Sequence, residues 1–153
     1  MKLLFEYNWQ VRNEWFEWCS HVPNEVLIHK RIGGAGSILH TFFHIVDTEL
    51  SWIRAIEGKP DIAPQFSDYN SLAQVVQFSK DSNEEIKDFI LSWSTELERK
   101  TVMPSWMENE SFTAGEILRH IIAHEIHHIG QLSIWSRELE LKPVSSNFIG
   151  RGL

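Results

Sequence analysis

The chain has 153 residues, of which 42% are hydrophobic and 23% are charged, and this length and balance predict a single globular domain over residues 1–153. Its formal net charge of −7 argues against nucleic acid as a partner, because a surface that follows phosphates needs clustered Lys and Arg. No uncharged apolar run approaches the roughly 20 residues that a membrane-spanning helix needs, so we expect no membrane association.

The N-terminal segment and the cysteine content predict the compartment. Residues 1–8 contain no long apolar stretch and no cleavage site typical of a secretory signal. The single cysteine, Cys19, has no internal partner for a disulfide, which is typical of the reducing cytoplasm. We therefore expect a cytoplasmic protein in which Cys19, surrounded by aromatic residues, is a buried structural thiol.

Apolar residues recur at helical spacing in four long segments. These predicted helices span Leu3–Ser20, Ile38–Ile56, Ser71–Arg99 and Thr113–Leu139. Ser37 is a suitable N-cap for the second helix, and Thr113 with Glu116 has the spacing of a capping box at the start of the fourth. The chain shows no clear strand pattern. Four such helices predict an all-α four-helix bundle, and connections of roughly a dozen residues allow a crossover.

A glycine-rich segment, Gly33–Gly36, precedes the second predicted helix. A phosphate-binding loop would follow a strand and end in Gly-Lys-Ser/Thr, and neither feature is present here. We therefore interpret the segment as a flexible turn that leads into the helix.

Two histidines one helical turn apart, His124 and His128, are the strongest functional signal in the chain. On a helical wheel both fall on the apolar row that begins at Ile117, which we expect to face the bundle interior. A buried polar pair is costly unless it is hydrogen-bonded or binds a metal, and imidazole is a common metal ligand. We therefore predict a metal site. His120 and His127 lie at the margin of this row and fit a hydrogen-bonded polar layer.

A third ligand has to come from another helix. The second predicted helix carries His40 and His44, again one turn apart, and spacing alone does not choose between them. Two histidines from one helix and one from a facing helix would leave positions open for water or substrate, as a catalytic site requires.

The segment His124–His128 also matches the H-E-x-x-H motif of zinc peptidases, in which Glu125 would be the general base. The extended form of that motif has Gly and His at the positions that Gln131 and Ile134 occupy here. The chain also lacks a predicted strand that would bind an extended peptide. The surrounding sequence therefore argues against a peptidase.

Two blocks of the sequence resemble the DinB superfamily, a group of metalloenzymes related to the bacillithiol and mycothiol S-transferases. The first block runs from Gly36 to Trp52 and contains a ligand histidine at His44 with Glu49 five residues later. The second block, residues 120–131, has the spacing His-x3-His-x3-His followed closely by Gly-Gln. With the order of the four helices, the likeness covers most of the chain.

Carried over by position, the resemblance assigns a metal triad to His44, His124 and His128 and leaves His40 as a neighbour of the site or a packing residue. It implies one divalent ion per protomer, such as zinc, nickel, iron or manganese, and a homodimer of bundles with a crossover connection. Glu125 stands where a small residue is common in the family, and we expect it close to the metal ligands or at an interface.

The function that the resemblance implies is metal-dependent transfer of a low-molecular-weight thiol to a small-molecule substrate. Three histidines with open positions beside them would let a metal lower the pKa of a bound thiol. Two alternatives stay open: a hydrolase that uses metal-activated water, and a metal-binding stress-response protein without catalysis. Thiol-dependent loss of an electrophile would separate the transferase from both.

A second apolar face of the fourth predicted helix also favours a homodimer. It lies to one side of the row that begins at Ile117 and consists of Leu118, Ile122, Ile126 and Ile129. Either a second copy of the chain or another helix of the same bundle would cover these side chains.

Overall fold

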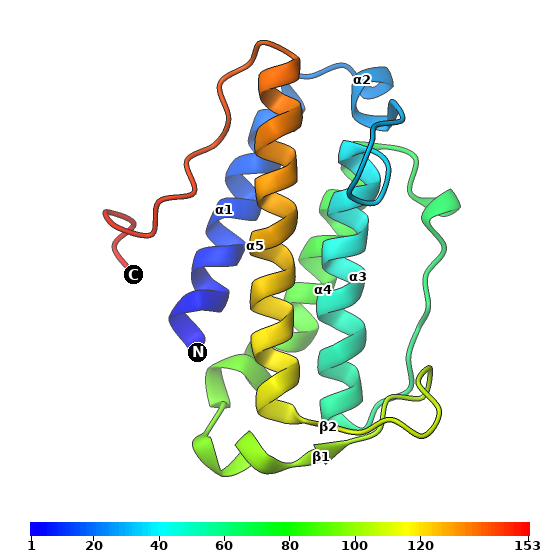
Figure 1. The fold of residues 1–153 in the computed structure, drawn as a ribbon, viewed down its shortest axis with the longest axis vertical. Helices are drawn as coiled ribbons and strands as arrows, with labels where there is room; N and C mark the ends of the chain where they lie inside the picture. The colour runs from blue at the N-terminus through cyan, green and yellow to red at the C-terminus, as the bar shows by residue number, and fades with distance from the viewer.

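A computed structural model describes residues 1–153 and shows four long helices packed side by side (Figure 1). The long helices are α1 (Lys2–Ser20), α3 (Ile38–Glu57), α4 (Leu72–Ser92) and α5 (Ala114–Glu138). The short elements are the helix α2 (Asn24–Ile28), the 3-10 helices η1 (Phe66–Asp68) and η2 (Thr95–Arg99), and the strands β1 (Thr101–Val102) and β2 (Phe112–Thr113). The predicted all-α bundle is confirmed. None of its helices combines the length and the apolar character needed to cross a bilayer.

The helices are arranged so that α1 packs against α4 and α5, and α3 packs against the same two helices. α1 and α5 run in one direction, and α3 and α4 run in the other (Figure 1). The connection from α3 to α4 therefore returns along the bundle. Asp61 accepts a hydrogen bond from Ser51 in the second half of α3, and Phe66 stacks on His40 near its first turn. This return is the crossover that the sequence prediction included.

The ends of α3 and α5 lie close to where the sequence places them. Ser37 accepts a hydrogen bond from the backbone N–H of His40 and begins α3. Gly58, with a left-handed φ of 77°, ends it. Thr113 and Glu116 form both hydrogen bonds of the predicted capping box at the start of α5. These caps set the register in which the two helices present their histidines.

The third long helix ends earlier than predicted. α4 stops at Ser92, and the last part of the predicted segment, up to Arg99, forms η2 instead. The Ser92 hydroxyl donates to the carbonyl of Phe89, a local bond that competes with helix continuation. The chain then passes beneath the bundle, where η2 packs on α5 and Glu98 pairs with Arg119. Helical periodicity does not encode these tertiary contacts.

Besides η1, two short features were not predicted from the sequence. The helix α2 has five residues, and the strands pair only Thr101 with Thr113 and Val102 with Phe112. Segments of this length contain little more than one repeat of a hydrophobic pattern, so periodicity does not reveal them. The strand pair fixes the approach of the chain to the first turn of α5.

The second apolar face of α5 is mostly covered within the protomer. Leu118, Ile122 and Ile129 are buried, and only Ile126, with 45% of its surface exposed, faces outward. α1 packs on this side, where Asn8 donates to the carbonyl of Ile122. Of the two possibilities left open for this face, a helix of the same bundle is the one observed, so this face does not support a homodimer.

Candidate metal centre

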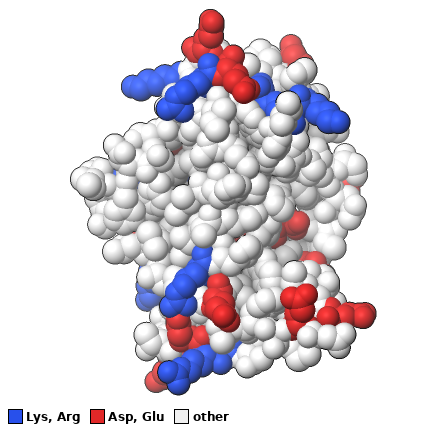
Figure 2. Space-filling view, viewed as in Figure 1, with Lys and Arg blue, Asp and Glu red and all other residues white.

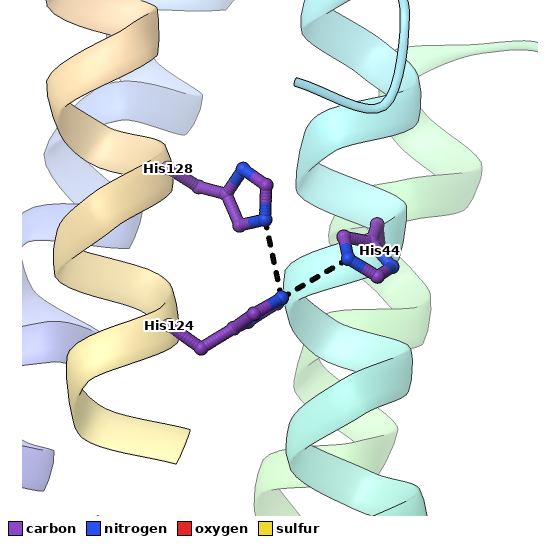
Figure 3. Close-up of side chains that lie close together, drawn as sticks. All are labelled: His44, His124 and His128. Carbon is purple, nitrogen blue, oxygen red and sulfur yellow. Dashed lines mark hydrogen bonds between the residues drawn. The ribbon is translucent and has the colours of Figure 1, made fainter. Parts of the chain in front are cut away.

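Three histidines from two helices converge between α3 and α5 (Figure 3). His44 comes from α3, and His124 and His128 come from successive turns of α5. The Nε2 atom of His124 lies 3.0 Å from Nε2 of His44 and 3.1 Å from Nε2 of His128. One nitrogen from each ring lies within 4.8 Å of the others. The structure thus brings together the three residues predicted as the triad.

The two distances from His124, to His44 and to His128, fit a shared metal ion. Two nitrogens that each lie about 2.0–2.1 Å from an ion, at coordination angles of about 90–109°, are about 2.9–3.4 Å apart. Hydrogen bonds among the three rings would satisfy their nitrogen atoms less well, because a neutral imidazole has only one N–H. The Nε2 atom of His124 is therefore unable to donate to both of its neighbours. Three imidazoles are a donor set that suits zinc, nickel and iron.

Burial keeps the three imidazoles neutral. Desolvation, followed by the neighbouring His128 and His44, lowers the pKa of His124 to about 3. Desolvation also lowers the pKa of His44 and of His128. Only a neutral imidazole offers a nitrogen lone pair to a metal. The triad is therefore in its metal-binding protonation state at neutral pH.

Gln131 orients one of the three rings. The Nδ1 atom of His128 lies 2.7 Å from Oε1 of Gln131 and donates to it, because the amide oxygen has no proton to give. That bond places the ring proton on Nδ1 and leaves the Nε2 lone pair directed toward His124. The Gln131 amide nitrogen lies 3.0 Å from Nε2 of His127, which accepts. This role of Gln131 was not predicted from the sequence, although its spacing of three residues from His128 was an available signal.

Gly34 places the glycine-rich segment against this part of the site. Its φ is 53°, and a Cβ at this position would lie 2.6 Å from Trp135 and 3.0 Å from the side chain of Gln131. A larger residue would displace one of them. The segment predicted as a flexible turn therefore packs on the residue that orients His128.

His40 and His120 lie outside the triad. His40 stacks on Phe66 with ring centroids 3.9 Å apart, so it is a packing residue, one of the two roles expected for it. His120 is exposed, and its ring lies 5.7 Å from that of His124 and 5.9 Å from that of Trp52. It therefore borders the triad on the side toward the start of α5.

Glu125 lies in the core beside α1, which differs from both of the locations expected for it. Only 1% of its surface is exposed, and its two carboxylate oxygens accept from Nε and Nη2 of Arg12 at 2.8 and 2.6 Å. A peptidase glutamate has to face the metal-bound water to take its proton. The pairing of Glu125 with Arg12 therefore argues further against the peptidase interpretation.

Arg12 is a second residue of this region whose role was not predicted from the sequence. It is 2% exposed, and its Nη1 atom also donates to Oε2 of Glu49 at 2.8 Å. Glu49 follows His44 by five residues on α3, and Glu125 directly follows His124 on α5. Arg12 thus ties α3 and α5, the two helices that carry the histidine triad, to α1. A lone arginine in an amphipathic helix is usually exposed, so no local pattern pointed to this network.

Comparison with known proteins extends the likeness to nearly the whole chain. A family model described as the DinB family matches residues 1–150. The Bacillus subtilis (strain 168) protein named "Uncharacterized protein YizA" is 53% identical over 153 residues, which are 100% of this chain and 96% of that protein. "Protein DinB" of the same organism is 27% identical over 149 residues, with 88% of this chain and 83% of that protein covered.

Proposed function

The chain belongs to the DinB family, and on that premise we propose that it binds one divalent ion through His44, His124 and His128 and transfers a low-molecular-weight thiol to a small-molecule electrophile. The observation that carries the proposal is the convergence of three neutral imidazoles between α3 and α5. We place this activity in the cytoplasm, where small thiols stay reduced.

A divalent ion held by these neutral ligands would keep its positive charge and lower the pKa of a thiol bound beside it. His128 is held ready for that task by Gln131, which fixes its Nε2 lone pair toward the other two rings. In the transfer, the thiolate sulfur forms a bond to the electrophilic carbon, and the leaving group departs with the bonding electrons. The thiol proton passes to solvent.

Cys19 does not supply the nucleophile. It is 1% exposed, as expected for a structural thiol, and burial raises its pKa to about 12. A thiol in this state forms almost no thiolate at neutral pH. The reacting sulfur in the proposal therefore belongs to a small molecule, and Cys19→Ala is a suitable control variant.

We expect the metal-loaded protein to consume chlorodinitrobenzene only when a thiol is supplied, because the proposal gives the protein no nucleophile of its own. The assay pairs the electrophile with cysteine, glutathione, bacillithiol or mycothiol and measures the rate above the uncatalysed reaction. His128→Ala should return that rate to the uncatalysed level, and Cys19→Ala should retain it. Turnover without any thiol would instead indicate a hydrolase that uses water. Absence of turnover with every thiol would contradict the transferase.

We further propose that the protein forms a homodimer through the outer face of α5. Figure 2 shows that charged side chains gather toward the two ends of the molecule and leave an uncharged band across the middle of this view. In the same view α5 lies at the front of the bundle (Figure 1). This helix exposes Ala123, Ile126, Gly130 and Ile134 at helical spacing. Its two isoleucines are 45% and 60% exposed, and the small residues between them would allow a close approach of a second helix.

The dimer proposal predicts a particle of twice the 17.9 kDa chain mass in sedimentation at micromolar concentration. The double variant Ile126→Glu and Ile134→Glu should weaken association by at least about 100-fold, because each copy would bury two unpaired charges at the interface. Ile149→Glu is the matched control, since Ile149 is 93% exposed on the C-terminal segment. A monomeric wild-type protein would contradict the proposal.

A further inference from the structure

A small apolar cavity lies between α3, α5 and the chain that precedes α5. It has a volume of about 280 Å³, and its lining consists of Trp52, Met107, Phe112, Glu116, Ile117 and His120. Trp52 follows His44 by two turns on α3, and His120 precedes His124 by one turn on α5. The two helices are antiparallel (Figure 1). These spacings therefore put the cavity and the triad along the same seam between α3 and α5.

Contacting aromatic rings join the cavity to the triad. The ring of His120 lies 5.7 Å from that of His124 on one side and 5.9 Å from that of Trp52 on the other. Trp52 in turn makes edge-on contacts with Phe112 at 5.8 Å and with Trp106 at 5.2 Å. A molecule in the cavity would therefore have one end next to His120, which is the ring that borders the triad.

The lining of the cavity favours a ligand without charge. Four of its six residues are hydrophobic. The only charged one is Glu116, whose Oε2 atom accepts from the backbone N–H and the hydroxyl of Thr113. No Lys or Arg lines the cavity, so an anion placed there would lose its hydration without gaining a partner.

The rings around the cavity favour a flat aromatic group. Trp52 and Phe112 meet nearly at right angles, at 83°, and such walls make edge-to-face contacts with an inserted ring. The volume is close to the lower end of the range of about 300–1,000 Å³ that small-molecule pockets span. One small ring system fits this space better than an extended ligand does.

We propose that this cavity binds the neutral aromatic group of the electrophile and holds its reactive carbon toward His120 and the triad. The catalytic meaning of this site rests on the thiol transfer proposed above. Binding of the ring itself requires neither the metal nor the thiol, because the triad does not line the cavity.

The test measures binding of naphthol, a neutral ring without a leaving group, to the full chain with zinc and after chelation. Fluorescence titration is suitable because Trp52 lines the cavity and Trp106 contacts it. We expect saturable binding in both states, and binding at least about tenfold weaker for naphthalenesulfonate, whose fixed negative charge would be desolvated without a partner.

Variants of Met107 test the location. Met107→Lys places an ammonium group in the cavity, Met107→Trp fills it without charge, and each should weaken naphthol binding at least about tenfold. Met103→Lys makes the same charge change on the same segment at a position that is 71% exposed and outside the lining, so its binding should equal that of wild type. Failure of the wild type to bind naphthol, or equal losses in Met107→Lys and Met103→Lys, would overturn the inference.

Kinetics separate this inference from the proposed function. If both hold, Met107→Lys raises the KM for chlorodinitrobenzene and leaves the KM for the thiol and the bound zinc unchanged. Naphthol binding that depends on Met107, without turnover for any thiol, would support the cavity and overturn the transferase. Turnover whose KM for the aromatic substrate is the same in Met107→Lys, without naphthol binding, would support the transferase and overturn the cavity.

Discussion

Replacing His128 with alanine is expected to lower the affinity for a divalent ion by more than about 100-fold. Loss of a group that only supports a metal ligand typically costs about 10–100-fold, and loss of the ligand itself should exceed that. The same result is expected for His44→Ala and His124→Ala, because one nitrogen from each of the three rings lies within 4.8 Å of the others (Figure 3). Titration of the chelated protein with zinc, followed by measurement of metal per protomer, checks this.

His40→Ala is the matched control for the metal prediction. His40 lies on the same helix as His44, one turn earlier, but stacks on Phe66. This variant should retain metal at about one ion per protomer. Near-unit stoichiometry that survives in all three triad variants would contradict the proposed site, and loss of metal in His40→Ala would move the third ligand to that position.

Metal removal should also lower the melting temperature. The ion would join His44 to His124 across 80 residues of sequence, so the unfolded chain does not keep the site. Free metal at about 100 times its Kd stabilises the native state by about 2.7 kcal/mol, or about 5–10 °C for a chain of this size. An unchanged melting temperature after verified metal removal would show that the ion does not join the two helices.

Replacing Arg12 with methionine should have the largest effect on stability, a loss of about 3–5 kcal/mol in the free energy of unfolding. Arg12 is the only cation that pairs with Glu49 and Glu125, and both carboxylates are 1% exposed. Its removal leaves them buried without a partner. Trp9, which donates to Oε1 of Glu49 at 2.8 Å, would compensate only in part.

Denaturant unfolding at several pH values checks the Arg12 prediction. Desolvation already raises the pKa of Glu125 with Arg12 present, and loss of the guanidinium raises it further. A carboxyl group whose pKa is higher in the folded than in the unfolded state makes the folded protein less stable as the pH rises from the lower to the higher of these two pKa values. The deficit of Arg12→Met should therefore shrink as the pH falls below 7, because the raised pKa of Glu125 favours uptake of a proton in the folded state.

Two further variants show whether charge burial is the cause. Arg137→Met makes the same substitution at an exposed position of α5 and should change stability by no more than about 0.5 kcal/mol. Combining Arg12→Met with Glu49→Leu and Glu125→Leu should recover most of the lost stability, because no buried charge is left. If Arg12→Met lost as little stability as Arg137→Met, the network of Arg12, Glu49 and Glu125 would contribute little to the free energy of unfolding.

The features that sequence alone determined are local ones. Four helices follow from apolar residues at helical spacing, and Ser37 and the Thr113–Glu116 pair mark two of their starts, since a cap is set by residues within one turn of each other. The pairing of His124 with His128 follows in the same way from a spacing of four residues. For the third ligand, spacing left both His40 and His44, and only the family resemblance selected His44.

The tertiary structure decided what depends on contacts between segments far apart in the chain. The crossover makes α3 antiparallel to α5, and that places His44 against His124 and Trp52 against His120. Packing of α1 on α5 buries Arg12 with Glu125. Hydrophobic periodicity reports which face of a helix is buried, but it does not report which helix covers that face. The histidines on each helix were therefore visible in the sequence, while their convergence at one place, the charge network beside them and the aromatic cavity depended on the packing of the bundle.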